Sequence, residues 1–211
     1  MSKENILKKL FAAQKNVNFD LKEPDFSENV YFETTTFLPL LFKEELEKVF
    51  GQVFLCETFK DLKQNLQQYF LEKQYASLFC NDSVLQNILR LISVEYIENT
   101  NIFPEIDAAL TRAEVFVAQT GSLLVSAALP QGRQTNVITP VHLVVGTYSQ
   151  IVESLPEAFL FVQNKYANNL PSMINIITGA SRTADIEKTL VLGAHGPKEI
   201  SVFLVNENIF S

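Results

Sequence analysis

Apolar residues recur at helical spacing through the first third of the chain, among charged and amide residues. The pattern predicts three helices in this part, over residues 3–15, 38–50 and 58–74. Gly51 is expected to end the second helix, and a short strand is predicted over residues 52–57. Residues 16–36 are polar and extended in character. We therefore expect an N-terminal helix and arm over residues 1–36, followed by a domain over residues 37–211.

After residue 75, short apolar runs alternate with helical segments. We expect strands over residues 76–80, 93–97, 114–119, 122–127, 141–146, 173–178 and 201–205, and helices over 84–91, 148–153 and 156–167. The Asn-Asp-Ser sequence at 81–83 can cap the first of these helices, and Thr120-Gly121 is typical of a hairpin turn. The runs 141–146 and 173–178 are nearly all apolar, like strands covered on both faces. This order predicts an α/β fold with a mostly parallel sheet between helices and one antiparallel hairpin inside the sheet.

Composition narrows the class of protein. Apolar residues make up 47% and charged residues 19% of the 211 residues, which excludes a disordered chain. The net charge of −7 argues against binding to nucleic acid, which requires a basic face. The N-terminus does not read as a signal peptide, and no apolar run approaches the roughly 20 residues of a membrane-spanning helix. Cys56 and Cys80 stand alone in apolar runs, so we expect buried thiols, no disulfide, no metal site and a cytoplasmic location.

The segment after the strand predicted over 173–178 contains the largest group of candidate ligand-binding residues. The strand is expected to run into a tight turn at Gly179, and the hydroxyls of Ser181 and Thr183 can cap a helix that starts directly afterwards. With the Arg182 guanidinium, the free amides at such a helix start would form a pocket for a carboxylate or a phosphate. The alternative is purely structural, with hydroxyls that only cap the helix and an Asp185 that only complements its dipole.

Both histidines of the chain are candidates for acid–base chemistry or for ligand contact. His142 lies inside an apolar run, whereas His195 lies in a turn where its ring can reach solvent. Either ring can also serve only a structural purpose. Ser181, His195 and Asp185 offer the residue types of a hydrolytic triad, but a triad is defined by geometry, and Asp185 is only four residues from Ser181.

Two further loops contribute candidate ligand contacts. One is the turn formed by Gln119, Thr120 and Gly121 between two predicted strands. The other is the polar loop that carries Arg133, which could fold over a ligand. An exposed arginine that is only solvated fits the second loop equally well.

Three segments together resemble the lactate utilization (LUD-domain) family. They are Ala118-Gln119-Thr120-Gly121-Ser122, Pro140-Val141-His142-Leu143-Val144-Val145, and Thr178-Gly179-Ala180-Ser181-Arg182-Thr183-Ala184-Asp185-Ile186-Glu187. Leu192-Gly193-Ala194-His195-Gly196-Pro197 and a closing strand follow the third segment at the expected distance. The resemblance covers about residues 75–211, and the third segment is its most specific part.

The resemblance implies a three-layer α/β/α sandwich like that of ribose-phosphate isomerase and the coenzyme A transferases, after an N-terminal helical extension. It also implies a role in oxidising L-lactate to pyruvate, together with partner subunits that carry iron–sulfur clusters, and no cofactor on this chain. Two positions depart from the family pattern. Gln119 stands where the family usually has Glu, and an amide cannot act as a base or nucleophile; Ala180 replaces a common proline.

These observations support three hypotheses. The first is a cluster-free accessory component of a lactate oxidation system that binds a small anionic ligand. The second is a free-standing sugar-phosphate isomerase or acyl/coenzyme A transferase-like enzyme, against which Gln119 counts. The third is a pure interaction subunit that docks through residues 1–36, since an amphipathic helix cannot bury its apolar face alone. The sequence leaves open whether the chain catalyses any step and whether it forms a homodimer.

Overall fold

The computed structural model describes residues 3–14, 33–98, 106–167, 169–183, 191–193 and 195–210. The chain divides into two compact units, Met1–Phe32 and Glu33–Ser211. In the first unit the described element is α1 (Lys3–Gln14), a helix that matches the predicted one to within a residue. Its Ile6 and Leu7 side chains are about half exposed. Among the described helices of both units, none is long and apolar enough to cross a membrane.

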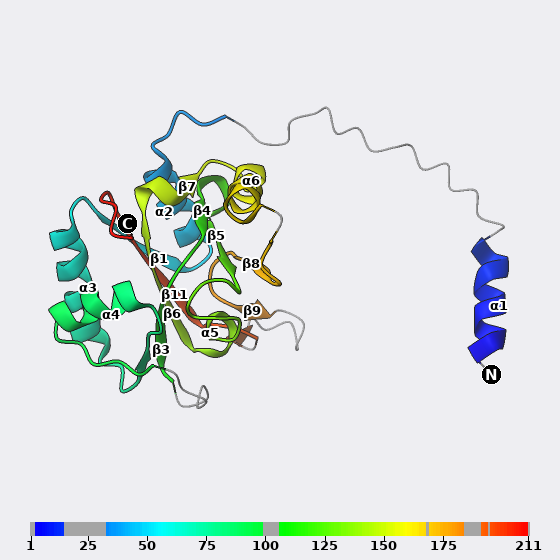
Figure 1. The fold of residues 1–211 in the computed structure, drawn as a ribbon, viewed down its shortest axis with the longest axis horizontal. Coiled ribbons are helices and arrows are strands. Elements are labelled where there is room, and N and C mark those ends of the chain that lie inside the picture. The colour runs from blue at the N-terminus through cyan, green and yellow to red at the C-terminus, as the bar shows by residue number, and fades with distance from the viewer. Residues whose placement is uncertain are drawn as a thin grey trace. The chain divides into compact units, whose positions relative to one another are not determined.

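The second unit is built on a sheet of five strands that all run parallel (Figure 1). In spatial order they are β1 (Gly51–Cys56), β11 (Glu199–Val205), β6 (Val141–Thr147), β3 (Ala108–Arg112) and β2 (Leu78–Phe79). The predicted α/β class with a mostly parallel sheet is therefore confirmed. Strand β3 was not predicted, because its alanines and its polar end (Thr111 and Arg112) give no apolar run. The strand predicted over 93–97 is reduced to one bridge between Ile97 and Phe79.

The predicted hairpin forms, but it lies in a second sheet rather than inside the parallel one. That sheet has the order β7 (Ile151–Val152), β4 (Val115–Val117), β5 (Ser122–Ser126) and β8 (Ile174–Ile177), with β4 and β5 antiparallel. Strand β8 is at its edge, and Ile176 is 44% exposed, so the expectation that both faces are covered is wrong for this run. The helix predicted over 148–153 is a single 3₁₀ turn, η3 (Tyr148–Gln150), followed by β7. Two more short strands, β9 (Arg182–Thr183) and β10 (Val191–Leu192), pair antiparallel.

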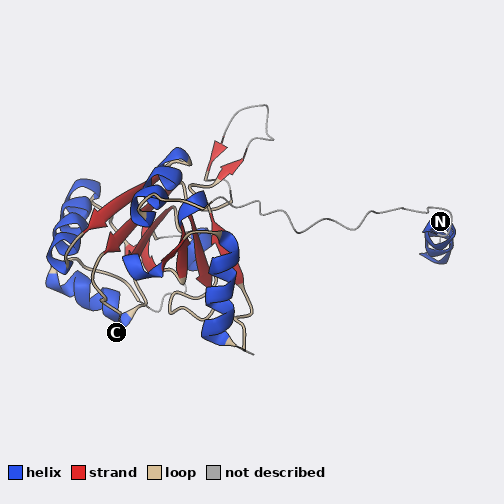
Figure 2. Cartoon of the chain, turned by 90° about the horizontal axis from the view of Figure 1, so that it is seen from above, coloured by secondary structure: helices blue, strands red, loops and turns tan. Residues whose placement is uncertain are grey.

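Helices cover both faces of the parallel sheet. Helices α3 (Phe59–Lys73) and α4 (Ser83–Leu91) pack on one face, against alternate strand residues such as Leu143 and Val145. Helix α2 (Leu38–Lys48) and the second sheet pack on the other face, against residues such as Val144. Helix α6 (Leu155–Tyr166) covers the far side of the second sheet. Figure 2 shows strands enclosed between helices in this unit.

The helix ends follow from local chemistry. Asp82 caps α4 as predicted, because its Oδ1 accepts hydrogen bonds from the Val84 and Leu85 amides at 3.0 and 3.1 Å. The end of α2 differs from the prediction. Phe50, not Gly51, takes the left-handed conformation (φ 65°), and β1 begins directly at Gly51.

The η2 turn (Ala118–Thr120) connects β4 to β5 and ends at Gly121, which has a φ of +58° and lies against the backbone of α2. A Cβ added there would lie 2.2 Å from the Leu46 amide nitrogen, so only glycine fits. Gly132 also has a positive φ (+70°), but an added Cβ would meet no atom within 4 Å. Both glycines have a positive φ, but only Gly121 has no room for a Cβ. Substitutions at the two positions therefore distinguish the cost of backbone strain from the cost of steric overlap.

We expect Gly121→Ala to destabilise the domain by about 3 kcal/mol or more, because it combines strain with a clash against helix backbone. Gly132→Ala should cost only about 1 kcal/mol, because the left-handed backbone alone opposes it. Urea denaturation of both variants measures the difference. Equal losses for the two would show that α2 can move away from the turn without cost.

Candidate functional site

Two of the predicted turns lie side by side on the C-terminal half of α2. Gly121 contacts the helix at Leu46, and a Cβ on Gly179 (φ +75°) would lie 2.2 Å from the Val49 carbonyl oxygen. The Ser122 and Thr178 hydroxyls, one in each turn, are hydrogen-bonded at 2.7 Å. The structure thus joins two motifs that are almost 60 residues apart in the sequence.

Gln119 lies beside a carboxylate that the sequence analysis did not single out. Its Nε2 donates to Glu153 Oε1 at 3.2 Å, and its backbone amide donates to the Glu153 carbonyl at 3.1 Å. The same Glu153 oxygen accepts the Thr34 amide at 2.5 Å. Thr120 is exposed and donates to the Ser122 hydroxyl at 2.8 Å. Glu153 was missed because it falls in the segment that was predicted as a helix, whereas it lies in the bend between β7 and α6.

Arg182 is exposed, and its guanidinium carbon lies 5.1 Å from the centre of the Phe50 ring. That ring is 63% exposed, because the left-handed backbone at Phe50 turns it away from the core. Stacking on an aromatic face leaves the edge of a guanidinium open to an anion. Within the described parts of the chain, no carboxylate forms an ion pair with Arg182.

Ser181 joins the two C-terminal family motifs through its backbone. Its amide donates to the Pro197 carbonyl at 2.8 Å, and its carbonyl accepts the Gly193 amide at 2.9 Å. Thr183 belongs to strand β9, and the helix expected to follow it, with Asp185, lies outside the described residues. The turn that contains His195 is therefore fixed at both ends to Ser181, the residue directly before Arg182.

His195 lines a cavity of about 420 Å³ at the amino ends of β6 and β11. Lys198 lines the same cavity, and its backbone amide donates to the Pro140 carbonyl at 2.8 Å. The other walls are Val137 and Ile138 of α5 (Thr135–Ile138) and the two glycines of the turn. The Lys198 ammonium and the His195 imidazole both suit an anion. Lys198 was missed because the last strand was predicted to begin at residue 201, whereas β11 begins at Glu199, directly after Lys198.

His142 and Arg133 are apart from this cavity. The His142 ring is fully buried in the sheet, where its Nε2 lies 2.8 Å from the Thr111 hydroxyl, and it does not line the His195 cavity. Its Nδ1 has no hydrogen-bond partner in the described structure, and burial lowers the pKa of the ring to about 4. Arg133 is exposed and donates from Nη2 to the Ser172 hydroxyl. The described residues hold no group of three or more His, Cys, Asp or Glu side chains that could bind a metal ion.

The family model of the LUD domain matches residues 40–205, which is most of the chain. The chain belongs to the LUD domain family. Its matched region begins in α2 and ends in β11, and so contains both sheets and the turns described above.

Curated relatives of this LUD domain protein match about half of its length. Lactate utilization protein C of Bacillus subtilis is 30% identical over 112 residues, 52% of this chain and 47% of that protein. An uncharacterised protein of Neisseria meningitidis serogroup B is 30% identical over 106 residues, 50% of this chain and 45% of that protein. The alignments therefore span about half the length of the curated relatives.

A solved structure shows the same fold. A DUF162 family protein from Deinococcus radiodurans superimposes with a TM-score of 0.61 over 80% of this chain and 96% of that one, at 16% sequence identity. At that identity the likeness concerns the fold alone.

We expect the stability of this LUD domain protein to fall as the pH drops from about 6.5 to about 4, because His142 is neutral in the folded chain and takes up a proton on unfolding. The loss should reach on the order of 3 kcal/mol, given 1.4 kcal/mol for each pKa unit. Urea denaturation at several pH values, with and without His142→Asn, measures it. The control variant His195→Gln keeps the buried His142 ring and should therefore show the same loss of stability as wild type. An equal pH dependence in wild type and His142→Asn would contradict the assignment to His142.

Proposed function

We propose that this LUD domain protein is a cluster-free accessory component of an L-lactate oxidation system and binds a small organic anion. The family assignment and the relatives named lactate utilization protein C support the pathway. The anion site that we propose is the His195–Lys198 cavity, and we propose that Arg182, which follows the Ser181 tied to the His195 turn, also contacts the anion. Iron–sulfur subunits are the proposed partners, and the cytoplasm is the proposed location.

The observation that carries the ligand proposal is the gathering of two cationic side chains and one imidazole in an acidic chain. The chain has 24 acidic against 17 basic residues, yet Lys198, His195 and Arg182 lie on segments that Ser181 ties together. In the described structure neither Arg182 nor Lys198 is paired with a carboxylate. Cations without neutralising partners attract carboxylates, and a guanidinium can bind one through two hydrogen bonds.

The thiols support a role in which partner subunits supply the redox centres. The chain has two cysteines, Cys56 and Cys80, and both are buried. Burial raises the pKa of Cys80 to about 12, and its Sγ donates to the Asp82 carbonyl. A buried thiol of high pKa is a poor metal ligand, because the thiolate is the ligating form. Electron transfer in the proposed system would then depend on clusters carried by other chains.

An acyl- or coenzyme A-transferase-like enzyme is the second candidate, and one observation favours it. Glu153 places a carboxylate against Gln119, so the turn has an ionisable group although position 119 does not. A carboxylate in such a place can act as a nucleophile toward an acyl group. Turnover of a coenzyme A ester by the isolated chain, lost in Glu153→Gln, would favour this candidate over the accessory component.

We expect calorimetric titration with L-lactate, pyruvate and coenzyme A to show saturable binding of at least one anion. Arg182→Ala and Lys198→Ala should each weaken that binding about tenfold, as expected for loss of one charge-assisted hydrogen bond. Arg90→Ala is the matched control, because Arg90 is also exposed and also stacks on an aromatic ring, that of Tyr96 at 5.6 Å.

The control should bind as wild type does. Identical heats for wild type, Arg182→Ala and Lys198→Ala would defeat the ligand proposal. Association with iron–sulfur subunits that persists without any anion binding would instead favour a pure interaction subunit.

A further inference from the structure

A second cavity, of about 500 Å³, lies at the opposite end of the parallel strands from the His195 cavity. Its walls come from Arg112 at the end of β3, Thr147 at the end of β6, Lys165 in the last turn of α6, and the loop after β5. The carboxyl ends of parallel strands are where ligands bind in open α/β sheets. Strand β6 has seven residues, so about 20 Å of sheet separates the two cavities.

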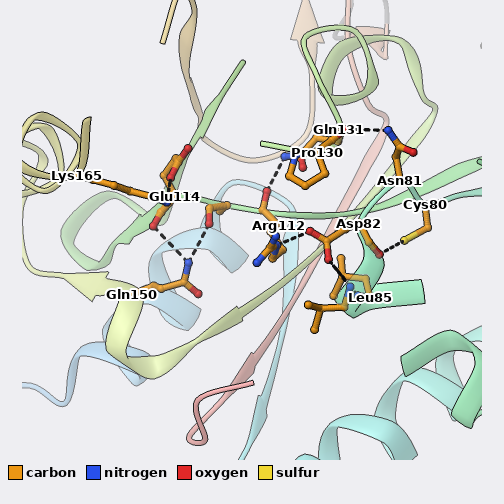
Figure 3. A network of polar contacts seen from close by, with 12 residues as sticks. Cys80, Asn81, Asp82, Leu85, Arg112, Glu114, Pro130, Gln131, Gln150 and Lys165 are labelled. Carbon is orange, nitrogen blue, oxygen red and sulfur yellow. Dashed lines mark hydrogen bonds and ion pairs between the residues drawn. The ribbon is translucent and has the colours of Figure 1, made fainter. Parts of the chain in front are cut away.

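One side of this cavity is an arginine held by a buried carboxylate. Arg112 Nε lies 2.5 Å from Asp82 Oδ2, and the Asp82 side chain is 2% exposed and fixed by its cap of α4. The guanidinium also stacks on the Phe210 ring, 4.7 Å from its centre. In Figure 3 the far end of the guanidinium points away from Asp82. Among the described residues, none accepts a hydrogen bond from its two Nη nitrogens, so this end is available to a ligand.

A lysine held in the same way lies on another side. Lys165 Nζ lies 2.6 Å from Glu114 Oε2, and Glu114 is fully buried (Figure 3). Burial by itself raises the pKa of Glu114, but hydrogen bonds from Lys165, from the Ser126 hydroxyl at 2.5 Å and from the Tyr166 hydroxyl at 2.6 Å bring it below its usual value. Glu114 is therefore ionised at neutral pH and fixes the Lys165 ammonium, which keeps further N–H groups for a ligand.

The loops that hold these charges are themselves fixed. Gln131 Nε2 donates to the Arg112 carbonyl at 2.7 Å, and Gln150 Nε2 donates to the Ala113 carbonyl at 2.9 Å. The remaining wall is mixed, with the hydroxyls of Thr147 and Ser149 beside apolar side chains. Sites for small molecules combine an apolar wall, a few fixed polar groups and a volume of about 300–1,000 Å³. The cavity meets each of these conditions.

We propose that this cavity is a second ligand site, which takes the carboxylate of a small organic acid between Arg112 and Lys165. A planar carboxylate matches the open edge of a guanidinium. A phosphate dianion fits less well, because Asp82 and Glu114 already neutralise the two cations and leave the site close to zero net charge. The proposal does not depend on the anion site beside His195.

The full chain is titrated with propionate and, separately, with inorganic phosphate, while its amide chemical shifts are recorded. Shifts at individual residues then show which site each anion occupies. We expect saturable propionate-induced shifts at Arg112, Ala128 and Ser149. Ala128 is exposed on the cavity wall, so Ala128→Glu places a negative charge there with little effect on folding. It should weaken propionate binding at least tenfold, whereas the isosteric neutral control Ala128→Gln should bind within about twofold of wild type.

The Arg112→Lys variant keeps a positive charge beside Asp82 but lacks the planar edge of the guanidinium. It should fold as wild type does and bind propionate about fivefold more weakly. Arg182→Ala should leave all of these shifts unchanged, which separates this site from the one beside His195. Shifts confined to the His195 turn, no saturable shift, or equal affinities for Ala128→Glu and Ala128→Gln would overturn the proposal. Phosphate binding as tight as propionate binding would overturn the carboxylate class.

Discussion

The close contact between α2 and two glycine turns is the constraint on which the arrangement of both sheets depends. Phe42 of α2 packs edge-on against Phe116 of the second sheet at 5.3 Å, while fully buried Leu46 lies next to Gly121. A side chain at either turn would push the helix away from the turns. Because α2 ends there, the chain reverses sharply at Phe50, and this reversal presents the ring on which Arg182 stacks.

Local patterns predicted the elements that depend on few distant contacts. The apolar runs of β6 and β11, the cap of α4 and the 114–127 hairpin are each encoded within about a dozen residues. The division into two sheets was not predictable in this way, because strand pairing is fixed by the partners and not by the strand itself. For the same reason the edge position of β8 was missed, whereas the strand Ala108–Arg112 was missed because its sequence has no apolar run.

The two candidate sites differ in how much of them the sequence can reveal. The turns at Gln119–Gly121 and Gly179–Arg182 are contiguous motifs, so the order of amino acids alone is enough to mark them. The structure adds Glu153 and Lys198, each contributed by a neighbouring segment. The cavity at the carboxyl ends draws single residues from several segments, and its charges pair with carboxylates far away in sequence. No local motif marks such a site.

Electrostatics give the two cavities different characters. In the described structure neither Lys198 of the amino-end cavity nor Arg182 has a carboxylate partner. We therefore expect the site proposed there to attract anions over a distance, an attraction that salt screens over about 8–10 Å. At the carboxyl ends, the buried carboxylates Asp82 and Glu114 cancel that long-range field and leave only directed hydrogen bonds. We therefore expect the first proposed site to select for charge, and the second to select for the shape of the carboxylate and for the groups that flank it. If both proposed sites bind their ligands, a chain of net charge −7 admits small acids at either end of the same sheet.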